Sequence, residues 1–226
     1  MTLPGRVPRR SLLLAGLAGA WTAQAKEPPL QVLIDGSIEM PQALFKDGRP
    51  VDGLQVLLAL ELGQRLGRSV RFRLAPRRRI AQMLDQGQEA DLICNYIPGW
   101  LPGPLQWSRP YLDDADMLVT AVRQPAPAQL QDVRGQRIGT VSGFFYPEAE
   151  AALGSGFVRD DAPNLITNLR KLASGRIDHA IVGRVTFEYL QRRGELPLSL
   201  HPPLVIAKQR VACALSSRKA GKRISG

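Results

Sequence analysis

The side chains that most often carry catalysis are sparse in this sequence and stand apart from one another. The segment Gly139-Thr-Val-Ser142-Gly143 has one residue too many between its first glycine and its serine to be a nucleophile elbow. His179 falls inside an expected buried strand and His201 precedes two prolines, so neither is placed to act as a general base. We therefore expect a protein that is not an enzyme.

The cysteines and histidines do not suggest a metal centre either. Cys94 and Cys213 lie in apolar surroundings, and together with the two histidines they show no recognisable metal-ligand spacing. We expect no metal and no cofactor. In an oxidising compartment the two cysteines could form a disulfide, but an apolar cysteine also serves as a small core residue. Spacing alone leaves both readings open.

The chain is basic, with a net charge of +10 over 226 residues. A nucleic-acid binder is expected to concentrate such charge on one stripe with interleaved aromatic residues. The one dense run is Arg77-Arg78-Arg79, at the start of an expected helix, and we interpret it as a solvated helix end rather than a phosphate or carboxylate site. We expect no nucleic-acid partner.

The elements around these residues are expected to alternate between strands and helices. In the first half, apolar runs and helical periodicity predict strands over 30–34, 70–74 and 91–94, and helices over 54–66 and 80–84. Strands joined by single helices normally form a parallel sheet, which holds ligands beyond the carboxyl ends of its strands. The loops after Ile34 and Cys94 are therefore the places where we expect function.

A second unit of the same kind follows a strand over 117–122 and the proline-rich segment 124–128, which we interpret as a crossover or hinge. Its pattern predicts strands over 137–141, 157–159 and 178–182, and helices over 147–153, 163–172 and 185–193. The tail over 204–216 is again strand-like, and no helix of its own half precedes it. The sequence thus predicts two similar α/β halves in succession.

The first 25 residues have the pattern of an export signal. Arg6, Arg9 and Arg10 precede an apolar run over 12–20, and Ala23-Gln24-Ala25 supplies the small residues that signal peptidase requires. The paired arginines also resemble a twin-arginine signal, although ordinary secretory signals carry arginines there too. We expect a periplasmic mature protein that begins near Lys26, exported by the Sec or twin-arginine route.

Several segments occur in an order and at a spacing that resemble one known family. They are Met40-Pro41, Asp47-Gly48, Gly53-Leu54-Gln55-Val56, Leu84-Asp-Gln-Gly-Gln-Glu-Ala-Asp-Leu92, Trp107-Ser-Arg-Pro-Tyr111, Asp132-Val-Arg-Gly-Gln-Arg-Ile-Gly139 and Leu172-Ala-Ser-Gly-Arg-Ile-Asp-His-Ala180. On these segments the chain resembles the periplasmic solute-binding proteins of family 3, best known for amino-acid importers. The resemblance covers nearly all of the chain after the leader.

The resemblance implies an α/β, two-lobed fold of the periplasmic-binding-protein type II, in which each lobe is a mostly parallel sheet flanked by helices and two strands form the hinge. It implies a first lobe over 26–122 plus 205–226 and a second lobe over 123–204. The returning strand of such a fold lies beside the third strand of the first lobe, which would place Cys94 and Cys213 on neighbouring strands. The segment 217–226 begins where the family has a longer last helix, so we expect a fragment or a truncated helix.

The resemblance also implies a function. A small-molecule ligand is captured by hinge closure and delivered to an ABC-type permease in the inner membrane, and the binding protein is expected to be a monomer. Two alternatives stay open on the same fold. One is a stand-alone sensory or partner-binding protein, and the other is an enzyme similar to cyclohexadienyl dehydratase.

Three positions depart from the amino-acid-binding pattern of the family. Leu101 stands where the family has an arginine that binds the ligand carboxylate, Phe144 where it has a hydroxyl residue, and Gly183 where it has the acid that holds the α-ammonium group. Burying a zwitterion without paired charges costs several kcal/mol. We therefore expect a ligand that is not a standard α-amino acid and that has a planar or apolar portion.

The expected lining of the cleft consists of aromatic and polar residues in the loops at the strand ends. They are Asp35, Asn95, Tyr96, Trp100, Ser142, Phe144 and Arg184. Some of these have simpler alternatives: Trp100 could cap its loop, Arg184 could be a solvated helix start, and one of Phe144 and Phe145 is expected to face the core.

Overall fold

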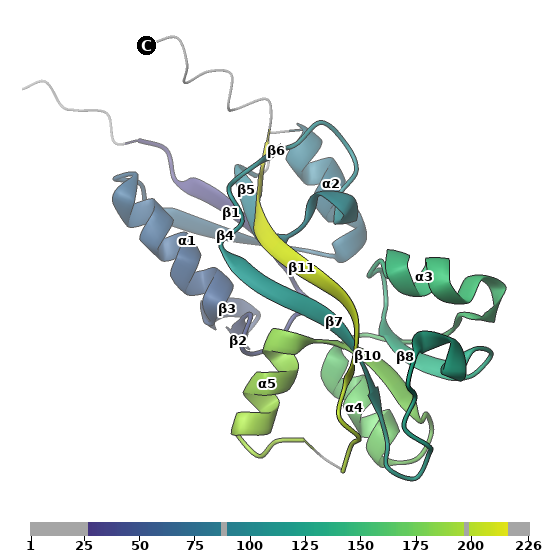
Figure 1. The fold of residues 1–226 in the computed structure, drawn as a ribbon. Helices are drawn as coiled ribbons and strands as arrows, with labels where there is room; N and C mark the ends of the chain where they lie inside the picture. The colour runs from purple at the N-terminus through teal and green to yellow at the C-terminus, as the bar shows by residue number, and fades with distance from the viewer. Residues whose placement is uncertain (1–26, 87–89, 197–198, 217–226) are drawn as a thin grey trace, which may run out of the picture.

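A computed structural model describes residues 27–86, 90–196 and 199–216. The expected leader over 1–25 and the expected truncated helix over 217–226 lie outside the described residues. Figure 1 shows two groups of elements joined by two long strands, β7 and β11, that run from one group to the other. The predicted α/β fold is confirmed.

The first group is built on three parallel strands with helices packed on them. Strand β1 lies between β4 and β5 and pairs with both in parallel. The elements are β1 (Leu30–Asp35), α1 (Leu54–Arg65), β4 (Val70–Ala75), α2 (Arg77–Gln86), β5 (Leu92–Tyr96), the 3₁₀ turn η1 (Pro98–Trp100) and β6 (Gln106–Trp107). A hairpin of β2 (Leu44–Lys46) and β3 (Arg49–Asp52) precedes α1. Its turn places Asp47 and Gly48 at positive φ, as an Asp-Gly hairpin turn requires.

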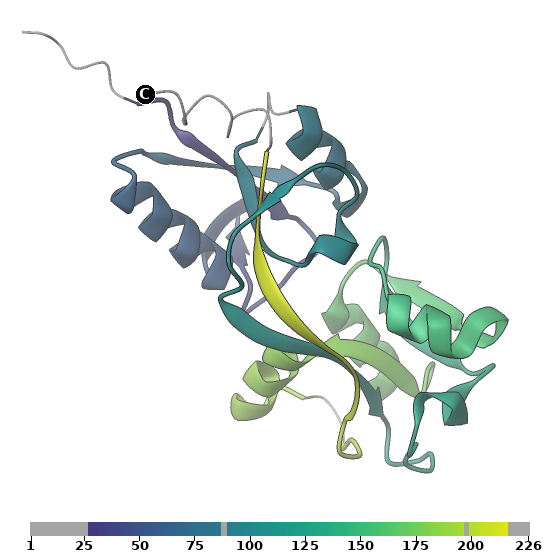
Figure 2. The same cartoon turned by 45° about the horizontal axis from the view of Figure 1, so that its top comes forward.

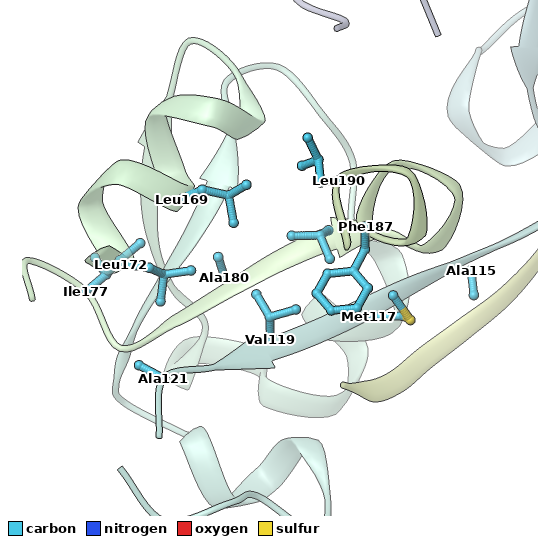
Figure 3. Close-up of a cluster of buried hydrophobic side chains, with 11 residues drawn as sticks. Ala115, Met117, Val119, Ala121, Leu169, Leu172, Ile177, Ala180, Phe187 and Leu190 are labelled. Carbon is cyan, nitrogen blue, oxygen red and sulfur yellow. The ribbon is translucent and has the colours of Figure 1, made fainter. Parts of the chain in front are cut away.

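The second group repeats the pattern with β8 pairing in parallel with β9 and β10. Its elements are η2 (Leu130–Val133), β8 (Arg137–Val141), α3 (Pro147–Leu153), η3 (Gly154–Gly156), β9 (Val158–Ala162), α4 (Leu165–Ala173), β10 (His179–Gly183) and α5 (Arg184–Arg192). Helix α4 begins at a cap in which the Asn164 side chain accepts a hydrogen bond from the Thr167 N–H at 3.0 Å. Figure 3 shows how α4 and α5 bury their apolar faces against β7 and β10.

Strands β7 (Leu112–Thr120) and β11 (Leu204–Leu215) connect the two groups. They pair with each other antiparallel over 204–211 of β11, and the end of β11, over 212–215, pairs with β5 and β6 of the first group. The strand order β4-β1-β5-β11-β7-β10-β8-β9 therefore runs through both groups, and Figure 2 shows the long strands crossing between them.

The end of β11 also joins β5 covalently. A disulfide connects Cys94 to Cys213, 119 residues apart in the sequence, inside an apolar cluster of the first group. None of the helices in the described part of the chain has the length and apolar character of a membrane span.

Candidate functional site

A cavity of about 120 Å³ lies between the two groups, which we call the inner cavity. Both groups contribute to its wall, because β1, β5, β8 and β10 end beside it. Of the predicted lining residues, it contains Asn95, Tyr96, Trp100 and Phe144. The strand ends of the two sheets thus meet where the parallel-sheet rule predicted a ligand site.

Two carboxylates of β7 face the inner cavity. Asp114 Oδ1 accepts hydrogen bonds from the Val185 N–H at 3.1 Å and from the Ala115 N–H at 2.8 Å. Asp116 Oδ2 accepts one from the Gln209 side-chain amide at 2.8 Å. Burial raises the pKa of both carboxyls, that of Asp116 to about 7, and these hydrogen bonds oppose the shift. A bound cation would relieve this cost because it stabilises the ionised carboxylates.

A third carboxylate, Glu39, lines the same cavity and reaches across it. Its Oε2 accepts a hydrogen bond from the Ile166 N–H at 3.2 Å, in the first turn of α4 in the second group. Burial raises the pKa of Glu39, while this hydrogen bond and the charge of Arg170 lower it. The contact joins the loop after β1 to the second group.

Arg77, the first residue of α2, is the one basic side chain among the described residues that line the inner cavity. Only 7% of its side chain is exposed, and its guanidinium carbon lies 4.4 Å from the ring centroids of both Tyr96 and Phe144. The interpretation of this arginine as part of a solvated helix end was wrong, although Arg78 and Arg79 are exposed as expected. Arg77 contacts residues of both groups. These residues are distant in the sequence, so no local sequence pattern predicts the contacts.

A second hollow of about 540 Å³, the outer groove, adjoins the inner cavity, and Arg77 and Ser37 line both. The predicted residues Asp35 and Ser142 line this groove rather than the inner cavity. Asp35 is fully buried and accepts hydrogen bonds at Oδ1 from the backbone N–H and the hydroxyl of Ser37, at 2.9 and 2.6 Å. Its other oxygen faces Arg77.

Asn95 is held in position by its neighbours. Its backbone is at φ 69°, a left-handed conformation that asparagine tolerates better than most residues. Its side-chain amide donates to Gln42 Oε1, and its carbonyl oxygen accepts from the Tyr111 hydroxyl at 3.2 Å. The residue therefore presents a fixed amide at the wall of the inner cavity.

The remaining predictions concern side chains away from the two hollows. Arg184 donates to the Asp113 carbonyl oxygen at 2.6 Å and lines neither hollow. His179 is buried with its ring nitrogens 3.0 Å from Thr120 Oγ1 and 2.8 Å from Gln136 Oε1, and His201 contacts the Gln124 carbonyl oxygen. Across the described residues no group of three metal-ligating side chains occurs.

This chain resembles known proteins in structure rather than in sequence. No known protein-family model and no curated protein matches the sequence. A histidine kinase sensor domain with similarity to periplasmic binding proteins has a TM-score of 0.69 at 23% identity, with 86% of this chain and 85% of that domain covered. The substrate-binding protein of an ABC uptake transporter from Streptococcus pneumoniae, with bound histidine, has a TM-score of 0.69 at 18% identity, covering 86% and 82%. An ancestral amino-acid-binding protein, a precursor of cyclohexadienyl dehydratase, has a TM-score of 0.68 at 15% identity, covering 86% and 84%.

The chain has the periplasmic-binding-protein fold. Its two groups of elements correspond to the two lobes of that fold, and we call them the first and second lobe from here on. The inner cavity lies between the lobes, where a binding protein of this fold encloses its ligand.

Two of the departures noted in the sequence have a structural explanation within this fold. Leu101 is 7% exposed and packs in the apolar cluster around Tyr96, so this position points into the first-lobe core. Gly183 lines the inner cavity, and a Cβ at this position would lie 3.6 Å from Asp114 Oδ2. Asp114 thus brings a carboxylate from the neighbouring strand to the place where an acid at position 183 would stand.

Sequence reasoning missed Glu39, Arg77, Asp114 and Asp116 as site residues. A signal for the two aspartates was present, because acidic residues at 114 and 116 alternate with Ala115 and Met117 just before an apolar run. Such alternation is typical of a strand with one polar face. The predicted strand began only at residue 117, since three acidic residues interrupt the apolar pattern before it.

Proposed function

We propose that this chain is a periplasmic solute-binding protein that closes its two lobes around a small organic cation and delivers it to an ABC-type permease. The observation that carries the proposal is the charge of the inner cavity. Three carboxylates face it, from Glu39, Asp114 and Asp116, and its one described basic side chain, Arg77, already lies beside a carboxylate and aromatic rings.

The charged side chains that line the inner cavity favour an amine over an α-amino acid as the solute. An ammonium group would be stabilised by the β7 carboxylates, whose ionised forms burial now disfavours. The carboxylate of an amino acid would add a like charge to the same small space, at a cost of several kcal/mol unless a cation pairs with it. Apolar wall residues such as Ile38, Leu165 and Val182 suit the uncharged part of the solute.

Closure is expected to work through the two strands that connect the lobes. Strands β7 and β11 carry Asp114, Asp116 and Gln209 on the cavity wall, so the solute would bind directly on the hinge. Glu39 supplies a contact from the first lobe to α4 in the second. A solute that bridges the lobes gives the closed form its advantage, because it binds that form better than the open one.

A thermal-shift screen of amines, α-amino acids and carboxylic acids tests this proposal. We expect amines to raise the melting temperature, since a ligand that binds only the folded state stabilises it. Asp116→Asn should abolish the shift. Asp113→Asn is the matched control, because Asp113 is on the same strand with a 75% exposed side chain paired to Arg210. Shifts produced by amino acids but not by amines would contradict the proposal.

A second candidate function, catalysis in the same cavity, is favoured by one observation. The Asp116 carboxyl has a pKa of about 7, which suits a group that gives and takes a proton near neutral pH. An elimination reaction like that of a dehydratase would need such a group. Turnover of prephenate by the wild type and its loss in Asp116→Asn would support this candidate.

A further inference from the structure

The guanidinium group of Arg77 is enclosed by aromatic rings from both lobes. Its central carbon lies 4.4 Å from the ring centroid of Tyr96 and 5.3 Å from that of Trp100, both in the first lobe. On the second lobe, the Phe144 ring centroid lies 4.4 Å away. Tyr96 and Trp100 are themselves packed edge to face, with centroids 6.0 Å apart. Distances below about 6 Å allow a cation–π attraction with each ring.

A buried carboxylate completes this enclosure. Asp35 Oδ2 lies 3.7 Å from Arg77 Nη1, and the Tyr96 hydroxyl lies 3.4 Å from the same oxygen. The side chains of Asp35 and Arg77 are 1% and 7% exposed, so water screens their attraction little. Aromatic faces together with a buried carboxylate are the groups that recognise a planar organic cation.

We propose that Asp35, Tyr96, Trp100 and Phe144 form a binding site for a guanidinium-type cation, and that Arg77 occupies it as a ligand built into the chain. We call these four residues the cation box. The cation box differs from the proposed solute site at Asp114 and Asp116, because a side chain of the protein already occupies it. It stands between the inner cavity and the outer groove, both of which Arg77 lines.

Occupation of the box connects the lobes. Arg77 begins α2 in the first lobe, whereas Phe144 follows β8 in the second. Gly143, at φ 81°, brings the second-lobe backbone close, so that a Cβ there would lie 3.4 Å from the Arg77 Cβ. The guanidinium therefore favours the closed arrangement of the lobes before any solute binds. A solute then needs a smaller preference for the closed form over the open form to complete closure.

One hydrogen-bond donor of Arg77 has no partner, as expected of a side chain that is bound mainly through its charge and its planar face. Its Nε is buried and has no hydrogen-bond partner, and the Trp100 indole nitrogen beside it has none either. The group is thus held by stacking and by charge rather than by a full set of hydrogen bonds. The alternative is that these two donors bind an anion, such as the carboxylate of a solute. The experiment below distinguishes this anion site from the cation box.

The test removes the built-in ligand and supplies a free one. Arg77→Ala should lower the melting temperature and increase the radius of gyration measured by small-angle X-ray scattering, because the box is empty and the lobes separate. Millimolar ethylguanidinium should restore at least half of both losses in this variant, and its effect there should be larger than any shift that the same concentration produces in the wild type through the carboxylates of the inner cavity. Ethylammonium at the same concentration should restore less, since it lacks the planar face.

The control is Arg78→Ala, which removes an exposed arginine from the same helix. We expect it to match the wild type in both measurements, with and without ethylguanidinium. An Arg77→Ala protein that is as compact as the wild type, or that ethylguanidinium does not stabilise, would overturn the proposal. Stabilisation of the wild type by acetate, lost in Arg77→Ala, would overturn it in favour of an anion site.

A second variant keeps the proposal testable if Arg77→Ala does not fold. Phe144→Leu retains Arg77 and the first-lobe part of the box and removes the ring on the second lobe alone. We expect a larger radius of gyration and a response to ethylguanidinium no greater than that of the wild type, because Arg77 still fills the box. A Phe144→Leu protein with the compactness of the wild type would contradict the connection between the lobes.

Discussion

At the scale of residues, Asp116 bears the largest electrostatic cost in the inner cavity. Burial is the main cause of its raised pKa, the charges of Asp114 and Glu148 add to it, and Gln209 and Arg77 oppose it. A carboxylate kept in such surroundings lowers stability, which is a common property of binding sites. In the proposed function, a cation that enters the cavity would offset this cost by stabilising the ionised carboxylate.

The first prediction concerns stability. The pKa of Asp116 is about 7 in the folded protein and near 3.8 when unfolded, so folding loses stability as pH rises between these values. Asp116→Asn removes this loss. Its free energy of unfolding should exceed that of the wild type by about 2–4 kcal/mol at pH 8, with little difference near pH 4. Urea denaturation at both pH values measures it, and an equal difference at the two would contradict the assignment.

The second prediction concerns binding. Below pH 7 the Asp116 carboxyl becomes protonated and loses its attraction for an ammonium group. The affinity for an amine should therefore fall about tenfold for each pH unit below 7, and binding near pH 7 should release protons. Calorimetric titrations in two buffers of different ionisation enthalpy detect that release. Affinity that is constant or that improves toward pH 6 would show that Asp116 does not contact the cation.

At the scale of elements, the strands that connect the lobes determine where the charged groups stand. Strand β7 places Asp114 and Asp116 on the cavity wall, and β11 places Gln209 opposite them. The end of β11 is secured to the first lobe by pairing with β5 and by the disulfide between Cys94 and Cys213.

The third prediction tests that disulfide. The bond closes a loop of 119 residues that includes the whole second lobe, so breaking it frees a large amount of chain entropy in the unfolded state. Reduction should lower the free energy of unfolding by about 3–5 kcal/mol. Denaturation with and without dithiothreitol measures this loss, and the Cys94→Ala, Cys213→Ala double variant, insensitive to the reductant, is the control. An unchanged midpoint on reduction would contradict it.

The elements also show what the sequence can and cannot predict. Local signals located β8 and α3 at their observed bounds, because β8 is rich in β-branched residues and Pro147 stands at the first position of α3. The hairpin of β2 and β3 was missed although Asp47-Gly48 is a strong turn signal. The burial of Arg77 could not be predicted, since it depends on Tyr96 and Phe144, which only the tertiary fold brings to it.

At the scale of the whole molecule, we propose a first lobe over 26–122 and 205–226, a second lobe over 123–204, and export to the periplasm. The chain carries a net charge of +10, yet the charged side chains that line the inner cavity, among the residues that the structure describes, are three carboxylates and one arginine. In the proposed function, selection of the solute would therefore depend on the local field of the cavity rather than on the overall charge of the protein.

The fourth prediction concerns export. The arginines, the apolar run and Ala23-Gln24-Ala25 predict cleavage after Ala25. N-terminal sequencing of the protein purified from the periplasm should begin at Lys26. Recovery of the uncleaved chain from the cytoplasm would contradict the proposed location.

The most direct test of the central claim is a calorimetric comparison of solutes that differ by one carboxylate. Histamine and histidine form one such pair, and tyramine and tyrosine form another. Because the β7 carboxylates stabilise an ammonium group and repel a carboxylate, the amine of a pair should bind at least about tenfold tighter than its amino acid. Tighter binding of histidine or tyrosine would contradict the account and would show that the Arg77 donors bind a carboxylate after all.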